Sequence, residues 1–260
     1  MNELQALLLG IIQGLTEFLP VSSSGHLEIG RALLGIKAEE SNLLFVLCVH
    51  VATVLSTIVV FRKDILELIK DLLKFEKNDS TIYVAKLLFS SIPILIIGLL
   101  FKEEVEAFFT GNVFFVGCML LFTACLLTLT HFVKSTPGKI TFLKAFIIGI
   151  AQMMAVLPGI SRSGATIATG LLLKVKKENV ARFSFLMVLI PILGAAFLDI
   201  VGGELATAEV EILPLLIGFL GAFISGLLAC SWMIKVVKKG KLYYFAIYCA
   251  VIGLIAIFAA

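Results

Sequence analysis

The sequence predicts an all-α integral membrane protein with six transmembrane helices and two re-entrant helical hairpins, arranged as an inverted-topology repeat. Of its 260 residues, 60% are hydrophobic and 15% are charged, whereas a soluble domain carries about 25% charged residues. The apolar residues form long runs, and two of these runs are broken by similar clusters of small polar residues. The basic residues behind the net charge of +3 lie between the runs, which indicates membrane topology and no nucleic-acid partner.

Six apolar runs approach the length of roughly 20 residues that a helix needs to cross a hydrocarbon core of about 30 Å. We expect each of them to be a transmembrane helix. In chain order they are Asn42–Phe61, Tyr83–Phe101, Val113–Val133, Arg182–Val201, Ile212–Ile234 and Leu242–Phe258.

Two further apolar regions are broken near their middle. The first covers residues 4–34 and is broken by Pro20 and the polar cluster 22–26, and the second covers 142–173 and is broken at 158–164. Each arm is too short to span a bilayer. Irregular backbone at membrane depth is tolerated only where it is buried in protein or lines a wet cavity, so we interpret both regions as re-entrant hairpins.

Lys and Arg gather in some loops and are scarce in the others. The basic loops contain Arg62, Lys63, Lys70, Lys74 and Lys77; Lys134, Lys139 and Lys144; Lys174, Lys176 and Lys177; and Lys235, Lys238, Lys239 and Lys241. The acidic loops contain Glu103, Glu104 and Glu106, and Glu204, Glu209 and Glu211. The positive-inside rule places the basic loops in the cytoplasm, and both termini then lie outside.

The two broken regions are copies of one another at a constant offset of 139 residues. Identical pairs at this offset include Gly10/Gly149, Ile11/Ile150, Gln13/Gln152, Ser22/Ser161, Ser24/Ser163, Gly25/Gly164, Leu33/Leu172, Leu34/Leu173, Lys37/Lys176 and Glu39/Glu178. We therefore predict one membrane domain, 1–260, built from repeats of approximately 1–134 and 140–260. Because each repeat has one hairpin and three spans, the second enters from the opposite side, and the hairpin tips should meet near the midplane.

The first tip carries ionisable side chains in an apolar setting. Glu17 lies four residues after Gln13, on the same helix face. A carboxylate at membrane depth is costly, so we assign Glu17 a function rather than a packing role. His26 follows within reach of Glu17 and is predicted to be catalytic.

The small residues next to Glu17 and His26 favour the binding of an anion. Ser22, Ser23, Ser24 and Gly25 follow a proline-broken turn and open a helix, where free backbone N–H groups can receive phosphate. They would serve equally well as helix caps, and the two roles are compatible.

The second tip adds a permanent positive charge. Arg162 has a planar donor fork that matches phosphate oxygens, and its partner is either Glu17 or a substrate phosphate. Ser161, Ser163, Gly164 and Thr166 supply further donors at a second helix start. Together the two tips suit phosphoryl transfer, in which positioning and charge stabilisation dominate. His50 and His131 are expected to pack or to lie at the membrane interface.

Two motifs resemble those of a known family. Gln13-Gly-Leu-Thr-Glu17-Phe-Leu-Pro20-Val-Ser22-Ser23-Ser24-Gly25-His26 resembles the (E/Q)xxxE-FLPVSS-x-GH motif of undecaprenyl-pyrophosphate phosphatases, the BacA-type bacitracin-resistance family. Pro158-Gly159-Ile160-Ser161-Arg162-Ser163-Gly164-Ala165-Thr166 resembles the second motif of that family, PGxSRSxxT. The resemblance covers essentially the whole chain.

The resemblance implies an activity and a location. The expected reaction is hydrolysis of undecaprenyl pyrophosphate to undecaprenyl phosphate and inorganic phosphate in the bacterial plasma (inner) membrane, which recycles the lipid carrier for peptidoglycan synthesis and confers bacitracin resistance. It also implies a divalent cation, Mg²⁺ or Ca²⁺, held by Glu17. Where other members have a Glu, this chain has Gln13, which cannot ionise, so Glu17 must carry the charge.

The mechanism that the family resemblance implies does not identify the nucleophile. Arg162 and the cation neutralise the pyrophosphate, and Ser23 or Ser22, His26 or an activated water attacks the terminal phosphorus. If His26 is not the nucleophile, it moves the proton. The active site is expected at the outer face if the first loop is the one open to solvent.

Two alternatives come from the architecture itself. Inverted repeats with hairpins that meet at the midplane are also found in transporters, so a lipid flippase or a secondary transporter of an anionic substrate stays the alternative function. A homodimer is left open.

Overall fold

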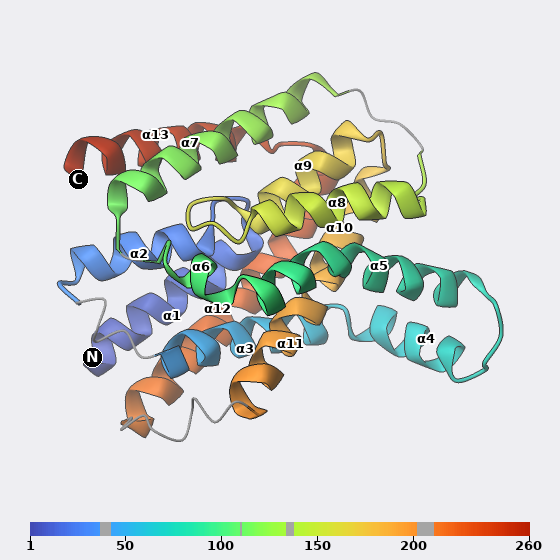
Figure 1. Cartoon of the computed structure of the whole chain (residues 1–260), viewed down its shortest axis with the longest axis horizontal. Helices are drawn as coiled ribbons and strands as arrows, with labels where there is room; N and C mark the ends of the chain where they lie inside the picture. Colours follow the sequence, from blue (N-terminus) through green and yellow to red (C-terminus); the bar gives the residue numbers. More distant parts are fainter. Residues whose placement is uncertain (37–42, 110, 134–137, 202–210) are drawn as a thin grey trace.

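The computed structural model describes residues 1–36, 43–109, 111–133, 138–201 and 211–260, and every regular element in these ranges is a helix (Figure 1). The helices are α1 (Glu3–Phe18), α2 (Ser23–Leu33), α3 (Leu43–Val60), α4 (Arg62–Leu72), α5 (Asp79–Leu100), α6 (Lys102–Glu106), α7 (Val113–Leu129), the 3₁₀ turn η2 (Thr130–Phe132), α8 (Phe142–Met154), α9 (Arg162–Leu172), α10 (Lys177–Met187), α11 (Leu189–Val201), α12 (Ile212–Lys239) and α13 (Tyr243–Ala259).

The structure confirms a helical protein with several segments that are candidate membrane spans. Within the described ranges, four segments are long and apolar enough to cross a bilayer: α5, α7 with η2, α10 with α11, and α12. A fifth candidate is the pair α3 and α4, which bends by 78°. The apolar helix α13 is shorter, at 17 residues. The first predicted span begins at Asn42, which lies outside the described residues, as do Lys37, Glu39, Lys134, Glu204 and Glu209 of the charge and repeat analysis.

Residues 62–77 were predicted to be a basic loop, and this prediction was wrong for most of the segment. The residues form α4, which leaves the bundle beside α5 (Figure 1). Leu68 is buried, whereas the charged side chains of the same helix are exposed or partly exposed. A helix can pack against the rest of the protein through a narrow apolar face. The many charged residues of α4 concealed that face in the sequence.

Large apolar residues are exposed on the outer surface of the helix bundle, as expected of a surface that faces lipid. On α12, Leu216, Leu220, Ile224 and Leu228 recur every four residues and are 53–68% exposed. The opposite face of the same helix is buried and is made largely of Gly, Ala and Ser. This division is the reverse of a soluble helix and matches a helix that packs through small residues and presents large ones to the bilayer.

Each of the two broken apolar regions folds as a pair of short helices, α1 with α2 and α8 with α9. In each pair a polar turn separates the arms, as the sequence indicated. Asn2 caps the start of α1 in a capping box with Gln5, with hydrogen bonds of 2.8 and 2.9 Å between side chain and backbone. Helix α1 ends at Phe18, just before Pro20, because proline and the residue before it disfavour further helix.

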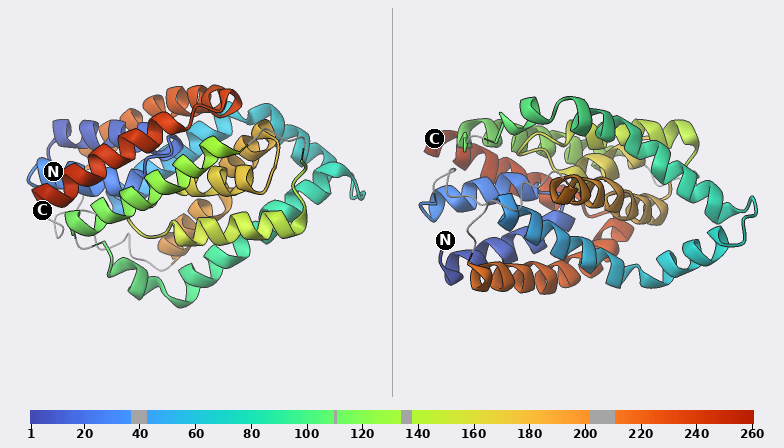
Figure 2. Two further views of the ribbon diagram at one scale, coloured as in Figure 1. Left: turned by 90° about the horizontal axis from the view of Figure 1, so that it is seen from above. Right: turned by 60° about the horizontal axis from the view of Figure 1, so that its bottom comes forward.

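Each first arm packs closely on a long helix of the other half of the chain. Helix α1 lies along α12, and α8 lies along α5 (Figure 2). A Cβ atom at Gly10 would lie 2.2 Å from the carbonyl oxygen of Gly218, and one at Gly149 would lie 2.1 Å from that of Ser90. Only glycine allows the backbones to approach this closely.

Candidate active site

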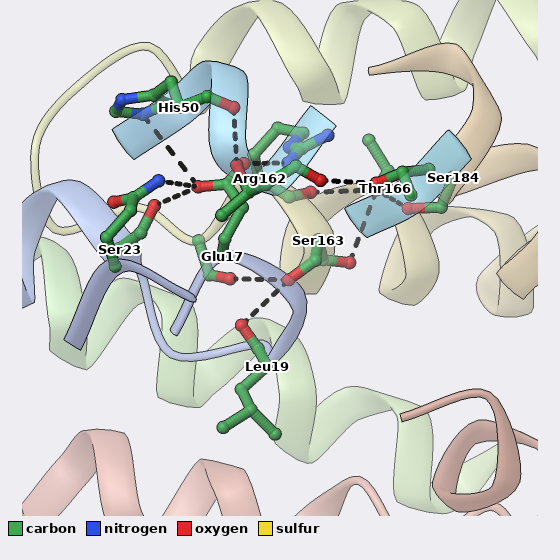
Figure 3. A network of polar contacts seen from close by, with 12 residues as sticks. Glu17, Leu19, Ser23, His50, Arg162, Ser163, Thr166 and Ser184 are labelled. Carbon is green, nitrogen blue, oxygen red and sulfur yellow. Dashed lines mark hydrogen bonds and ion pairs between the residues drawn. The ribbon is translucent and has the colours of Figure 1, made fainter. Parts of the chain in front are cut away.

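The two hairpin tips meet, as the sequence predicted. The Gly159 N–H donates to the Ser22 hydroxyl at 3.2 Å, and the Ser163 hydroxyl donates to the Leu19 carbonyl at 2.9 Å. Figure 3 shows the second of these bonds beside the ion pair between Glu17 and Arg162. One tip from each half of the chain is therefore required to build this site.

Equivalent serines cap the second arm of each hairpin. The Ser22 hydroxyl accepts from the Gly25 N–H at 3.2 Å, and the Ser161 hydroxyl accepts from the Gly164 N–H at 3.0 Å. Ser22 has a φ of +71°, a left-handed conformation that is costly for a residue with a Cβ. The hydrogen bonds that the Ser22 hydroxyl accepts from two backbone N–H groups help to hold Ser22 in this conformation.

Glu17 is the centre of the polar network. It is 8% exposed, and its Oε2 accepts from the Ser23 hydroxyl at 2.6 Å and from Gln13 Nε2 at 3.0 Å. Its Oε1 is paired with Arg162. A buried ion pair of this kind compensates charge without contributing much net stability, whereas removal of one partner is strongly destabilising.

His50 belongs to this network, although the sequence analysis gave it a packing or interfacial role. Its Nδ1 lies 2.8 Å from the Val46 carbonyl, which can only accept, so Nδ1 carries the proton. Nε2 is thereby turned towards Glu17, 4.0 Å from Oε2 (Figure 3). The available signal was an ionisable side chain inside an apolar span, which by itself indicates function.

A cavity of about 450 Å³ opens beside this network. Glu17, Ser23, Ser24, His50 and Arg162 line it, together with Gln152 and the ion pair of Glu28 with Arg31. The remaining walls are largely apolar and include Leu27, Val46, Ile94, Phe109, Val188 and Ile192. A polar end with apolar walls suits an amphiphile that has an anionic head and a hydrocarbon tail.

His26 is fixed on the other side of its helix. Its Nδ1 lies 2.8 Å from the Ser22 carbonyl, and its Nε2 lies 2.8 Å from the Tyr248 hydroxyl on α13. The two rings stack, with centroids 5.6 Å apart. His26 is absent from the described residues that line the cavity, so the expected reach to Glu17 is replaced here by contacts with the tip and with α13.

The predicted site residues thus divide into two groups. Gln13, Glu17, Ser23, Ser24 and Arg162 form the network or line the cavity. The others hold the tips in place, and they are Ser22, Gly25, His26, Ser161, Ser163, Gly164 and Thr166. Thr166, for example, bonds the Ser184 hydroxyl at 2.6 Å and so ties α9 to α10 (Figure 3).

The residues of the site fit a hard divalent cation with few protein ligands. In the described part of the chain no cluster of three or more His, Cys, Asp or Glu side chains could hold a metal. Glu17 offers a carboxylate, and the buried Oε1 of Gln13 has no hydrogen-bond partner in the structure. Oxygen ligands in small number match Mg²⁺, which keeps several of its waters and binds substrate phosphates.

Comparisons with known proteins find the same family over nearly the whole chain. Residues 6–255 match the family described as bacitracin resistance protein BacA. A Bacteroides thetaiotaomicron protein named undecaprenyl-diphosphatase is 57% identical, over 99% of this chain and 98% of its own length. Proteins of the same name from Bacteroides fragilis and Carboxydothermus hydrogenoformans are 56% and 39% identical, and the alignments cover at least 95% of both chains.

Proposed function

Because the chain belongs to the BacA family of bacitracin resistance proteins, we propose that it hydrolyses undecaprenyl pyrophosphate to undecaprenyl phosphate and inorganic phosphate. This reaction recycles the lipid carrier of peptidoglycan synthesis, and an abundant enzyme confers bacitracin resistance. The observation that carries the proposal is the cavity at the joined tips, where a carboxylate, a hydroxyl and a guanidinium meet beneath apolar walls.

Ser23 is the proposed nucleophile. Its oxygen would bond to the terminal phosphorus as undecaprenyl phosphate leaves, and a water would then hydrolyse the phosphoserine to release inorganic phosphate. Its hydroxyl lines the cavity and donates to Glu17 at 2.6 Å, so a base is already in contact with the proton that must leave. The Ser22 hydroxyl, in contrast, accepts hydrogen bonds from two backbone N–H groups. Both ring nitrogens of His26 are occupied by Ser22 and Tyr248. Among the groups left open by the sequence, this geometry favours Ser23 over Ser22 and His26.

Arg162 is proposed to neutralise the charge that develops on the transferred phosphoryl group. Only one of its terminal nitrogens is engaged by Glu17, and the buried Nη1 has no partner in the structure. A phosphate oxygen is the partner that a guanidinium fork suits best. Preorganised charge of this kind supplies much of the rate enhancement in phosphoryl transfer.

A divalent cation, Mg²⁺ or Ca²⁺, is proposed to be held by Glu17 with the neutral oxygen of Gln13. Such a cation would offset the negative charge of the diphosphate that a nucleophile must approach. Gln13 also keeps the Glu17 carboxylate oriented through its 3.0 Å hydrogen bond. His26 stays a prediction as the group that moves the proton to or from the reacting phosphate.

The topology is proposed to be six spans with two re-entrant hairpins, in repeats of approximately 1–134 and 140–260. Three observations support it. Each first arm packs on the long helix of the opposite half, through glycines 139 residues apart. The serine caps of the two tips are equivalent. Both termini lie at one end of the molecule (Figure 1), as an even number of spans requires.

The orientation is proposed from charge. The positive-inside rule places the basic loops in the cytoplasm of the bacterial plasma membrane and both termini outside. The first hairpin then enters from the outer face, and the cavity beside it would open to that side. Modification of an added terminal cysteine by a membrane-impermeant thiol reagent in intact cells checks this arrangement.

The test of function is phosphate release from undecaprenyl pyrophosphate by detergent-purified protein. Chelator-sensitive release is the expected result. A chain that releases no phosphate when folded and supplied with metal would instead support the alternative, a lipid flippase or anion transporter of inverted-repeat design. Lipid flux into sealed vesicles would then be measured, and light scattering of the same sample would decide the question of a homodimer.

A further inference from the structure

The side-chain amide of Gln152 on α8 is buried without a hydrogen-bond partner. Gln152 is 0% exposed, and neither its Nε2 nor its Oε1 has a partner among the described residues. Buried amides are almost always satisfied, because leaving one unpaired is costly. The same residue lines the cavity beside Glu17 and Arg162, so a molecule in that cavity is the available partner.

The internal repeat explains why this amide is free. Gln152 is the counterpart of Gln13, 139 residues earlier. In the first repeat, Gln13 Nε2 donates to Glu17, one helical turn further on. The position equivalent to Glu17 in the second repeat is Val156. The second hairpin therefore keeps the amide but lacks the carboxylate that would bind it.

A second unpaired donor lies in the same hairpin. Arg162 Nη1 is buried and has no hydrogen-bond partner among the residues that the structure describes, and Arg162 also lines the cavity. The first repeat supplies the carboxylate and the hydroxyl of the site, whereas the second supplies a cationic donor and a neutral one. Two donors without an internal acceptor call for a ligand with several acceptor oxygens, such as a diphosphate.

We propose that Gln152 is a substrate-binding residue whose Nε2 donates a hydrogen bond to a diphosphate oxygen, next to the contact made by Arg162 Nη1. The Oε1 of the same amide accepts from a water or from a protonated phosphate oxygen. Because the amide is neutral, it orients the head group without adding charge, and it takes no part in proton transfer. This inference rests on the proposed function, since it assigns a contact for the same substrate.

The substitution Gln152→Leu gives opposite results for a ligand contact and for a structural role. It removes both polar atoms and roughly keeps the volume, so the ligand-free protein should be as thermostable as the parent or more so. Affinity for the diphosphate should fall by about 10-fold or more, because a hydrogen bond to a charged group is lost. If Gln152 only held the fold together, through a buried water, stability would fall and affinity would not.

The experiment measures binding separately from hydrolysis. The probe is farnesyl methylenediphosphonate, in which a CH₂ group replaces the bridging oxygen so that the ligand stays intact. Parent, Gln152→Leu and Gln152→Glu are titrated in detergent, and their unfolding temperatures are recorded. Met154→Leu, on the exposed side of the same helix (47% exposed), is the matched control and should bind like the parent. Gln152→Glu keeps the size but repels the ligand, and it carries the test if the Leu variant does not fold.

Each outcome of the binding experiment supports or overturns the contact between Gln152 and the diphosphate. Weaker binding of at least about 10-fold in the Gln152 variants, with unchanged or higher stability, supports the contact. Parent-like binding by a folded variant overturns it. If the parent releases no phosphate from undecaprenyl pyrophosphate but the binding difference is present, the hydrolytic function fails and the contact stands. A parent that does not bind the probe at all overturns both.

Discussion

The Ser23 hydroxyl donates to Glu17 Oε2 at 2.6 Å across the turn that joins α1 to α2. The same carboxylate is paired with Arg162 from the other half of the chain. Glu17 therefore contacts the Ser23 hydroxyl through one carboxylate oxygen and Arg162 through the other. This shared carboxylate makes the two tips a single chemical unit, and the variants below separate its parts.

Replacement of Ser23 by Ala should abolish turnover while the protein stays folded. If Ser23 is the nucleophile, the loss in kcat should be on the order of 10⁴-fold or more, as for other nucleophile deletions. Phosphate release under saturating substrate measures it. Ser91→Ala is the control, because that hydroxyl is also buried but bonds the Leu87 carbonyl on α5. Substantial activity in Ser23→Ala would point to direct attack by water.

Arg162→Ala and Arg162→Lys should fail for different reasons. The Ala variant leaves the buried Glu17 carboxylate without its counter-charge, a loss of about 3–5 kcal/mol in unfolding free energy. The Lys variant keeps the charge but not the planar fork, so it should be more stable and yet lose roughly 10²–10³-fold in kcat. Thermal unfolding and phosphate release on the same samples separate the two effects. Equal activity of the Lys variant and the parent would contradict the assigned role.

Chelation should stop phosphate release, and Mg²⁺ should restore it. Glu17→Gln removes the carboxylate that is proposed to hold the cation and to receive the Ser23 proton, so turnover should be lost and Mn²⁺ affinity should fall by about 10-fold or more. Mn²⁺ binding followed by electron paramagnetic resonance provides a readout that does not depend on turnover. Glu3→Gln, on the exposed first turn of α1, serves as the control. Unchanged Mn²⁺ affinity in Glu17→Gln would remove this residue from the metal site.

The contact between His26 and Tyr248 predicts a small loss of kcat when Tyr248 is changed and a larger one when His26 is changed. Tyr248→Phe removes the hydroxyl that lies 2.8 Å from His26 Nε2, so kcat should fall by about 2- to 10-fold, the value of one hydrogen bond. His26→Ala should lose far more if the imidazole moves the proton. Tyr244→Phe is the control, since Tyr244 is 54% exposed at the start of the same helix. A His26→Ala variant with the activity of Tyr248→Phe would reduce His26 to a residue that only holds the tip.

Glycines at the crossings between the two halves should not tolerate a methyl group. Gly10→Ala and Gly149→Ala would place a Cβ within 2.2 and 2.1 Å of a carbonyl oxygen on the facing helix, and overpacking of this kind costs about 1–3 kcal/mol. Gly98→Ala and Gly194→Ala have no heavy atom within 4 Å of the new Cβ and should leave the unfolding temperature unchanged or raise it. Equal stability of all four variants would contradict the close packing.

The sequence predicted the tips well because their signals are local. A proline-broken apolar run, a serine cap and an out-of-place carboxylate each act within a few residues, so Glu17, Ser23 and Arg162 could be selected without a structure. Their convergence followed from the repeat. His50, Gln152 and Tyr248 were missed as parts of the site because helix packing, which no sequence periodicity encodes, brings them to the other site residues or to the cavity. The 78° bend after α3 was missed for the same reason.

The packing of α1 on α12 has a consequence for biosynthesis. The first hairpin leaves the ribosome early, but its partner helix begins only at Ile212. At synthesis rates of about 5–20 residues per second, the hairpin waits roughly 10–40 s for that partner. Glu17 lacks Arg162 for most of this interval and α1 lacks α12 for all of it, so the arm is expected to stay at the translocon or at the bilayer surface. Insertion of the first hairpin is therefore completed late in translation, and a chain truncated before α12 would expose an unfinished site to quality-control proteases.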